Sequence, residues 1–247
     1  MNQADFQANT PYARFGDVAI NASADERRVF IKRTYIHLML AIYAFVAFEW
    51  LFFAMGLEQP ALQFLGTSRF AWLIVLGGFM GISYLANSWA TSSTSRGMQY
   101  AGLSLYVIAE ALIFVPLLAI ARQQTVQVQG TSIGVIPAAA ITTLVIFGGL
   151  TAFVFISKQD FSFLGAFLGL AGFSAIALIV VAMLFGLNVG IWFVWAMVVL
   201  ASGYILYDTS NVLHRYRTDQ YVAASLALFA SVALLFWYVL QLFMRRD

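Results

Sequence analysis

Three acidic residues stand inside or at the edge of long apolar runs, where charged side chains are rare. They are Glu49, Glu110 and Asp208. An ionised carboxylate at the centre of a bilayer costs about 3 kcal/mol or more, so each must be protonated, paired or in contact with water. Intramembrane acids are typical of proton relays and ion pathways. These three are therefore the candidate site residues.

Glu49 and Glu110 differ in their expected depth. Glu49 lies beside Trp50 toward the outer end of the first apolar segment, which predicts a carboxylate within reach of headgroup water. Glu110 lies near the middle of the third segment, in SLYVIAEALIFVP, with no cation three or four residues away. We expect Glu110 either to line a pathway or to form a structural hydrogen bond to another helix.

Asp208 occurs in 203-GYILYDTSNV-212, at the end of the sixth apolar segment. The macrodipole disfavours a negative charge at a helix C-terminus, so the sequence predicts a cation nearby. The expected counter-charges are His214 and Arg215 in the following loop, or Arg96 from another loop. The alternative is a solvated acid at a helix end.

The composition indicates the elements that must position these acids. Of 247 residues, 62% are hydrophobic and 10% are charged, against about 25% charged in a soluble domain. A helix needs roughly 20 apolar residues to cross a bilayer. Seven segments meet this requirement, namely 35–56, 70–92, 98–121, 132–157, 161–185, 187–207 and 221–244. The sequence therefore predicts an all-α polytopic membrane protein, with seven transmembrane helices in residues 31–247 and a polar, disordered tail at 1–30.

Basic residues orient the predicted bundle. With the tail in the cytoplasm, nine of the thirteen Lys and Arg residues fall on the cytoplasmic side and four on the opposite side. Short cytoplasmic loops are enriched in such residues. We therefore expect a cytoplasmic N-terminus, and a C-terminus on the other side of the membrane.

Enzyme motifs, including that of an intramembrane zinc protease, are absent from the sequence. The chain has two histidines and no cysteine, and it lacks HExxH, GxSxG and Walker A sequences. His37 is expected to be an interfacial hydrogen bonder. A net charge of +2 gives no indication of nucleic acid as a partner. The prediction is a non-enzymatic protein without a cofactor, whose first partner is the lipid bilayer.

The fifth segment contains Gly165 and Gly169, a GxxxG pair. Small residues at this spacing let helix backbones approach closely. Ordinary packing within the bundle is one interpretation and a dimer face is the other, so the oligomeric state stays open.

The chain resembles the Bax inhibitor-1 family in several stretches. The most specific is 203-GYILYDTSNVLHRY-216, with Tyr-Asp-Thr near the end of the sixth helix. Others are 27-RRVFIKRTYIHLMLAI-42, 106-YVIAEALIF-114, 154-VFISKQDFSFLGAFL-168 and the seventh helix. The resemblance covers residues from about 27 to the end. It implies six helices around a central seventh, and a pH-sensitive calcium leak.

In that family, as the resemblance implies, two aspartates on the sixth and seventh helices form a proton-sensitive latch. Asp208 matches the first, and Ser231 stands where the second would be. A serine can donate a hydrogen bond to Asp208, but it supplies no charge repulsion. The latch therefore does not transfer intact. Any contact of Asp208 with a permeating calcium ion is expected to be transient.

Because it lacks the second aspartate, the chain resembles the bacterial YccA-like branch of the family. Members of that branch are associated with a membrane-bound AAA protease. The resemblance thus implies a multi-pass inner-membrane protein with a periplasmic C-terminus. Two functions stay open. One is a proton-sensitive cation leak gated near Asp208, and the other is a non-conducting modulator or substrate of the protease.

Overall fold

The computed structural model describes residues 18–68, 70–92, 95–128 and 130–245. In this part of the chain, seven helices are long and apolar enough to cross a membrane, and each corresponds to one predicted segment. They are α2 (Ala24–Ala54), α4 (Ala71–Ala90), α5 (Arg96–Ala121), α6 (Val135–Ser157), α7 (Leu164–Phe185), α8 (Ile191–His214) and α9 (Tyr221–Met244). The predicted all-α membrane fold is confirmed.

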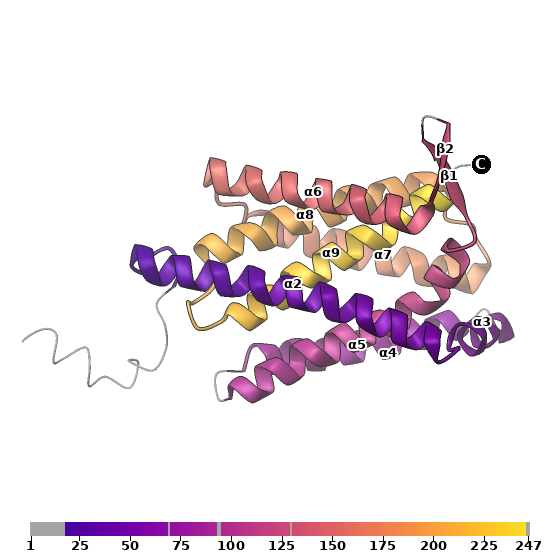
Figure 1. Cartoon of the computed structure of the whole chain (residues 1–247), viewed down its shortest axis with the longest axis horizontal. Helices are drawn as coiled ribbons and strands as arrows, with labels where there is room; N and C mark the ends of the chain where they lie inside the picture. Colours follow the sequence, from indigo (N-terminus) through magenta and orange to yellow (C-terminus); the bar gives the residue numbers. More distant parts are fainter. Residues whose placement is uncertain (1–17, 69, 93–94, 129, 246–247) are drawn as a thin grey trace, which may run out of the picture.

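The long helices alternate in direction between two ends of the bundle (Figure 1). The end where α2 begins is called the tail end below. The other is called the hairpin end, because β1 (Thr125–Val128) and β2 (Thr131–Gly134) form an antiparallel hairpin there. A short helix, α3 (Glu58–Thr67), lies at the same end and connects α2 to α4. Residues 57–69 and 122–131 lie between the predicted spans, so neither α3 nor the hairpin was expected.

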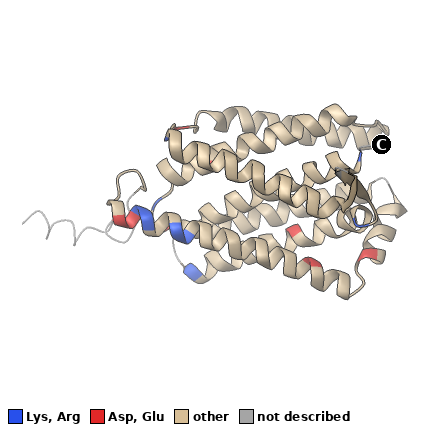
Figure 2. Ribbon diagram, turned by 45° about the horizontal axis from the view of Figure 1, so that its top comes forward, with Lys and Arg blue, Asp and Glu red and all other residues tan. Residues whose placement is uncertain are grey.

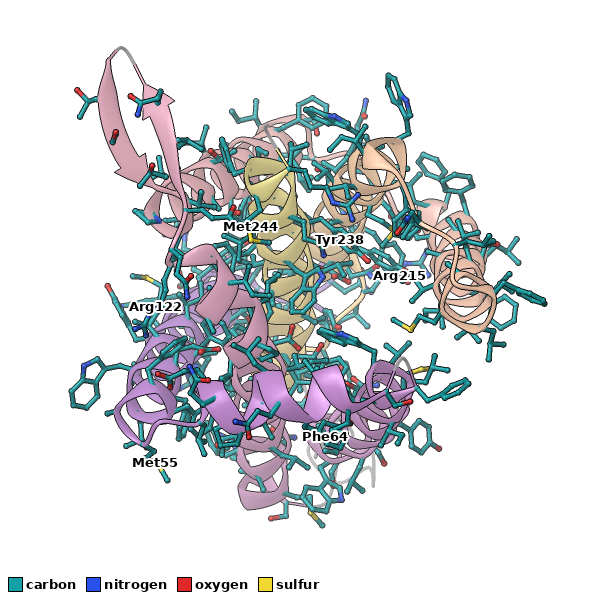
Figure 3. All side chains as sticks on the ribbon, turned by 90° about the vertical axis from the view of Figure 1, so that its right-hand side faces the viewer. Met55, Phe64, Arg122, Arg215, Tyr238 and Met244 are labelled. Atoms are coloured by element: carbon teal, nitrogen blue, oxygen red, sulfur yellow. The ribbon has the colours of Figure 1, made fainter. Side chains whose placement is uncertain are left out.

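Helix α9 lies at the centre of the bundle (Figure 1) and packs against α2, α4, α5, α6 and α8. Of its apolar window 72% is buried, and of that of α5 67%. The predicted central seventh helix is therefore confirmed. Helix α7, in contrast, packs against α8 and lies at the outside of the bundle (Figure 3).

The first helix begins earlier than hydropathy predicts. Ser23 accepts a hydrogen bond from the Glu26 backbone N–H, and the Glu26 side chain accepts one from the Ser23 backbone N–H. This capping box starts α2 at Ala24, well before the predicted tail boundary at residue 30. Just ahead of it, the Ala19 N–H donates to the Tyr216 carbonyl in the α8–α9 connection. The rest of the predicted tail, residues 1–17, lies outside the described residues.

The sixth transmembrane helix ends later than predicted. The predicted apolar segment stops at 207, yet α8 continues to His214, because the polar side chains that follow are buried against the bundle. Asp208 therefore lies well inside the helix, and the expected placement at its C-terminus is wrong. The predicted break before α8 is present, where Gly186 adopts φ +69° and ends α7.

Glycines on α7 bring it close to two tyrosines of α8. A Cβ on Gly165 would lie 2.8 Å from the Tyr207 ring, and one on Gly172 would lie 2.6 Å from the Tyr204 hydroxyl. A Cβ on Gly169 would meet nothing within 4 Å. The close-packing pair is therefore Gly165 and Gly172, and the GxxxG motif does not itself form the contact.

Candidate functional site

The central contact of the site joins α8 to α9. The Ser231 hydroxyl donates a hydrogen bond to Asp208 Oδ2 at 2.5 Å, and both side chains are buried, Asp208 with 8% of its surface exposed. The two helices pack along much of their length. The buried face of α9 includes small residues, among them Ala223, Ala224 and Ser225. The structure thus brings Asp208 and Ser231 together.

The three predicted counter-charges do not pair with Asp208. Arg96 donates to the Tyr221 hydroxyl at 3.1 Å. His214 Nδ1 lies 2.9 Å from the Ser210 carbonyl oxygen. Among the described residues, no Lys, Arg or His forms a salt bridge with Asp208. The expected charge pair is therefore replaced by a neutral hydrogen bond to Ser231, because the cations are held at the tail-end surface by other groups.

Arg215 is held by the α6–α7 loop. Its guanidinium donates to the Ser162 hydroxyl at 2.6 Å and lies 3.8 Å from Asp160. The Ser162 backbone N–H donates to the Asp160 carboxylate. That hydrogen bond is the main reason why the pKa of Asp160 lies below its ordinary value, with smaller contributions from His214 and Arg215.

The same loop is fixed to α8 through Ser210, two residues after Asp208. The Phe161 N–H donates to the Ser210 hydroxyl oxygen at 2.8 Å. Lys158, with φ +53°, ends α6 in the left-handed conformation and turns the chain into this loop. Sequence reasoning did not identify Ser210, because its partners lie about fifty positions away.

A pocket of about 360 Å³ opens at the tail end beside Asp208. Its lining residues come from the α6–α7 loop, from α8 and from the α8–α9 connection. They are Ser162, Tyr207, Asn211, Arg215, Tyr216 and Gln220. Tyr216 lies near enough to Asp208 that the carboxylate charge, together with burial, raises the pKa of the tyrosine.

Glu110 borders a second cavity, of about 300 Å³, in the hairpin-end half. Helices α4, α5, α7, α8 and α9 supply its walls, with Tyr238 on the α9 side (Figure 3) and Arg245 at the end of α9. Glu110 Oε2 has no hydrogen-bond partner, and Tyr106, one turn earlier on α5, is the polar side chain that interacts with the carboxylate. The structure therefore favours a cavity-facing acid over a structural hydrogen bond between helices.

The Asp208–Ser231 contact lies between the two hollows. Along the chain leading into and through α9, Gln220 lines the tail-end pocket and Leu234 lines the Glu110 cavity. Ser231 comes three residues before Leu234, an axial distance of about 4.5 Å at about 1.5 Å per residue. Measured along α9, the Asp208–Ser231 hydrogen bond thus lies between residues that line the two hollows, and neither Asp208 nor Ser231 is itself a lining residue of either one.

Glu49 does not reach water as predicted. Its side chain is 6% exposed, and neither carboxylate oxygen has a hydrogen-bond partner. Residues of α5, α6 and α9 line a cavity around Glu49 in the hairpin-end half. The expectation failed because position along the helix was used as a measure of depth, whereas packing decides burial.

An aromatic and basic cluster at the tail end was not predicted as a unit. His37 Nε2 lies 3.0 Å from the Tyr100 hydroxyl, which lies 3.3 Å from the Tyr221 hydroxyl. The guanidinium groups of Arg33 and Arg96 each lie within 6 Å of the Tyr221 ring centre. His37 is a hydrogen bonder, as expected, and the cluster links α2, α5 and α9.

Comparison with known proteins shows the family. The family model described as "Inhibitor of apoptosis-promoting Bax1" matches residues 27–247. "Bax inhibitor 1" of Schizosaccharomyces pombe is 28% identical over 226 residues, which is 87% of this chain and 76% of the relative. An uncharacterized protein of Pseudomonas aeruginosa is 29% identical over 178 residues, 69% of this chain and 72% of its own. "Protein lifeguard 4" of Mus musculus is 35% identical over 105 residues, 42% and 44% of the two chains. The chain belongs to the Bax inhibitor-1 family of multi-pass membrane proteins.

Proposed function

We propose that the protein is a proton-sensitive cation leak pathway, with calcium as the expected ion and Asp208 as the gating carboxylate. The observation that carries this proposal is the position of the Asp208–Ser231 hydrogen bond between the tail-end pocket and the Glu110 cavity. In this proposal, separation of α8 from α9 at this contact lets water and cations pass from one hollow to the other.

The chemistry of the contact gives the gate its proton dependence. Asp208 is buried and has a neutral donor, Ser231, as its hydrogen-bond partner. An ionised carboxylate in such a place is unfavourable unless water or a cation reaches it. Protonation therefore favours the closed contact, and loss of the proton favours entry of water and a cation.

Calcium would pass as the transported ion. It prefers oxygen ligands, and it needs several of them. Asp208 and Ser231 supply such oxygens at the gate, and Glu110 supplies a carboxylate in the hairpin-end cavity. One carboxylate at the gate supports a transient contact, which suits conduction better than storage.

We propose that the tail end faces the cytoplasm and that, in a bacterial cell, the bundle lies in the inner membrane. Basic residues gather where α2 and α5 begin at the tail end (Figure 2). At the hairpin end, the described basic residues are Arg122 and Arg245. The asymmetry matches the excess of Lys and Arg in cytoplasmic loops. In this orientation the Glu110 cavity belongs to the half facing the periplasm.

The test is calcium flux into dye-loaded proteoliposomes that hold the purified full-length chain, scanned across neutral pH. The wild type should leak more as pH rises. Asp208→Asn should remove most of the pH dependence, and Ser231→Asp should strengthen it, because two nearby carboxylates resist joint ionisation. Ser225→Ala is the control, since the Ser225 hydroxyl bonds to a carbonyl in its own helix.

A second candidate is a non-conducting modulator or substrate of a membrane-bound AAA protease. The neutral Ser231 at the gate favours it, because a carboxylate pair is missing. No calcium leak above that of empty liposomes at any pH would contradict the leak pathway. Slower degradation by such a protease after removal of residues 1–17 would then support the modulator.

A further inference from the structure

Two buried polar groups without partners border one cavity in the hairpin-end half. Within the part of the chain that the structure describes, neither oxygen of the Glu49 carboxylate on α2 has a hydrogen-bond partner. The Thr143 hydroxyl on α6 also lacks one, and its side chain is 2% exposed. Buried polar groups without partners are few in native proteins, because each costs about 1 to 3 kcal/mol. Two beside one cavity point to a ligand.

The cavity has a volume of about 250 Å³ and lies between α2, α5, α6 and α9. Apart from the two polar residues, its walls are apolar; they include Ile42, Phe45, Leu118, Ile136, Phe229 and Phe236. Sites for small molecules have this character, with a few polar groups in an apolar hollow.

The opening of this cavity faces lipid. Val46 on α2 and Leu144 on α6 both line it, and they are 57% and 55% exposed on the surface of the bundle. Both belong to membrane-spanning segments. A ligand would therefore enter sideways from the hydrocarbon region, so it must be soluble in lipid.

The carboxyl group of Glu49 determines which polar group the ligand should carry. None of the residues that line the cavity is Lys, Arg or His, so the protein supplies no cation to Glu49 there. A buried carboxylate is stabilised by a cation that also donates hydrogen bonds. A primary ammonium group does both, and its remaining protons are available to a neutral acceptor; the Thr143 hydroxyl borders the same cavity.

We propose that this cavity binds a lipid-soluble primary amine, with the ammonium group on Glu49 and Thr143 and the apolar body between α2 and α6. A cavity of about 150 Å³ holds a benzene molecule. By proportion, the Glu49 cavity suits a ligand of about ten non-hydrogen atoms. The site is separate from the Glu110 cavity and from the Asp208 contact.

The test uses the full-length protein in liposomes and an octylamine that carries a photoreactive diazirine in its chain. Cross-linked peptides are located by mass spectrometry, with octylamine, octanol and octanoate as competitors. We expect adducts on α2 and α6, with octylamine competing about tenfold better than octanol, as one charge-assisted hydrogen bond predicts. Octanoate should not compete. If all three compounds compete equally well, labelling reflects partition into lipid alone. If octanol competes as well as octylamine, the assignment of an ammonium group to this site is wrong.

Variants place the binding on the named residues. Glu49→Gln should lower labelling about tenfold and Thr143→Val less, as expected from their charged and neutral hydrogen bonds. Thr151→Val is the matched control, because this α6 hydroxyl is also buried but does not line the cavity. If Glu49→Gln fails to fold, Ala140→Phe fills the cavity and leaves Glu49 in place. Undiminished labelling in a folded Glu49→Gln or Ala140→Phe protein would overturn the proposal.

Discussion

The two halves of the bundle hold their buried carboxyl groups in different ways. In the tail-end half, Asp208 accepts a hydrogen bond from Ser231 across the α8–α9 contact. In the hairpin-end half, both oxygens of Glu49 and one of Glu110 lack partners, and each acid borders a cavity. The partnered acid holds two helices together, whereas the unpartnered acids are placed to meet something that the protein does not supply.

Close helix packing follows the same division. Near the tail end, a Cβ on Gly102 of α5 would lie 2.5 Å from the Ala86 carbonyl oxygen of α4. The tail-end pocket of about 360 Å³ is lined largely by polar side chains, whereas the cavities of about 250 and 300 Å³ in the hairpin-end half lie between apolar faces of the helices. Stability is therefore expected to depend on the tail-end half. Binding and passage of small molecules are expected to depend on the hairpin-end half.

The largest expected effect comes from Ser231→Val. The change removes the donor and leaves the Asp208 carboxylate buried without its partner, which should cost about 3 kcal/mol of unfolding free energy. Denaturant titration in detergent micelles measures this. Ser225→Ala, equally buried on α9, should cost much less. Equal losses in the two variants would show that the Asp208 contact does not hold α8 to α9.

Gly102→Ala tests the close packing of α4 and α5. The added Cβ meets backbone atoms of Ala86 and Ala90, which cannot rotate away, so the helices must separate at a cost of about 1 to 3 kcal/mol. Gly149→Ala on α6 is the matched control, because its Cβ would meet nothing within 4 Å. A lowered thermal midpoint in both variants would contradict the packing argument.

Glu49→Met should increase the stability of the protein, whereas the two preceding variants should decrease it. Methionine has a similar length, and the change removes a buried carboxyl group without partners. The free energy of unfolding should therefore increase by about 1 kcal/mol, which raises the thermal midpoint. Calorimetry or tryptophan fluorescence during heating would record the shift. A lower midpoint would mean that the carboxyl group is satisfied in the membrane, and the contrast between the two halves would fail.

The smallest effect is expected at the surface of the tail end. The pKa of Asp160 is lowered from its ordinary value of 3.8, mainly by the Ser162 backbone N–H. The stabilisation is therefore complete above that value, and it is lost as pH falls through the lowered pKa. In Asp160→Asn, stability should therefore fall slightly less steeply as the pH is lowered in the acid range. The dependence of stability on pH should not change near neutral pH. Thermal midpoints of the two proteins across the acid range would show the difference.

Helix number and the family could be predicted because they depend on local signals. Apolar runs of bilayer length gave all seven spans, and Tyr207-Asp208-Thr209 was specific enough to indicate the family. Asp208 and Ser231 were paired through that resemblance, and the structure brings them together. Their role as a proton-sensitive gate stays a prediction.

The partners of polar residues could not be predicted, because they depend on which helices lie side by side. Arg96 interacts with Tyr221, 125 positions away, and Arg215 with Ser162, 53 positions away. The end of α8 was misplaced for the same reason. Hydropathy reads Thr209 and Ser210 as solvent-exposed, but packing buries both of them.

The hydrogen bond between Ser210 and the α6–α7 loop couples α8 to a loop that is exposed to solvent. Phe161 and Ser162 are held by Ser210 and Arg215, so a shift of α8 at Asp208 must carry the loop with it. Gln159 lies exposed on that loop, and the chain has no cysteine. A single fluorophore attached through Gln159→Cys would therefore convert movement at the buried carboxyl group into an optical signal outside the bilayer.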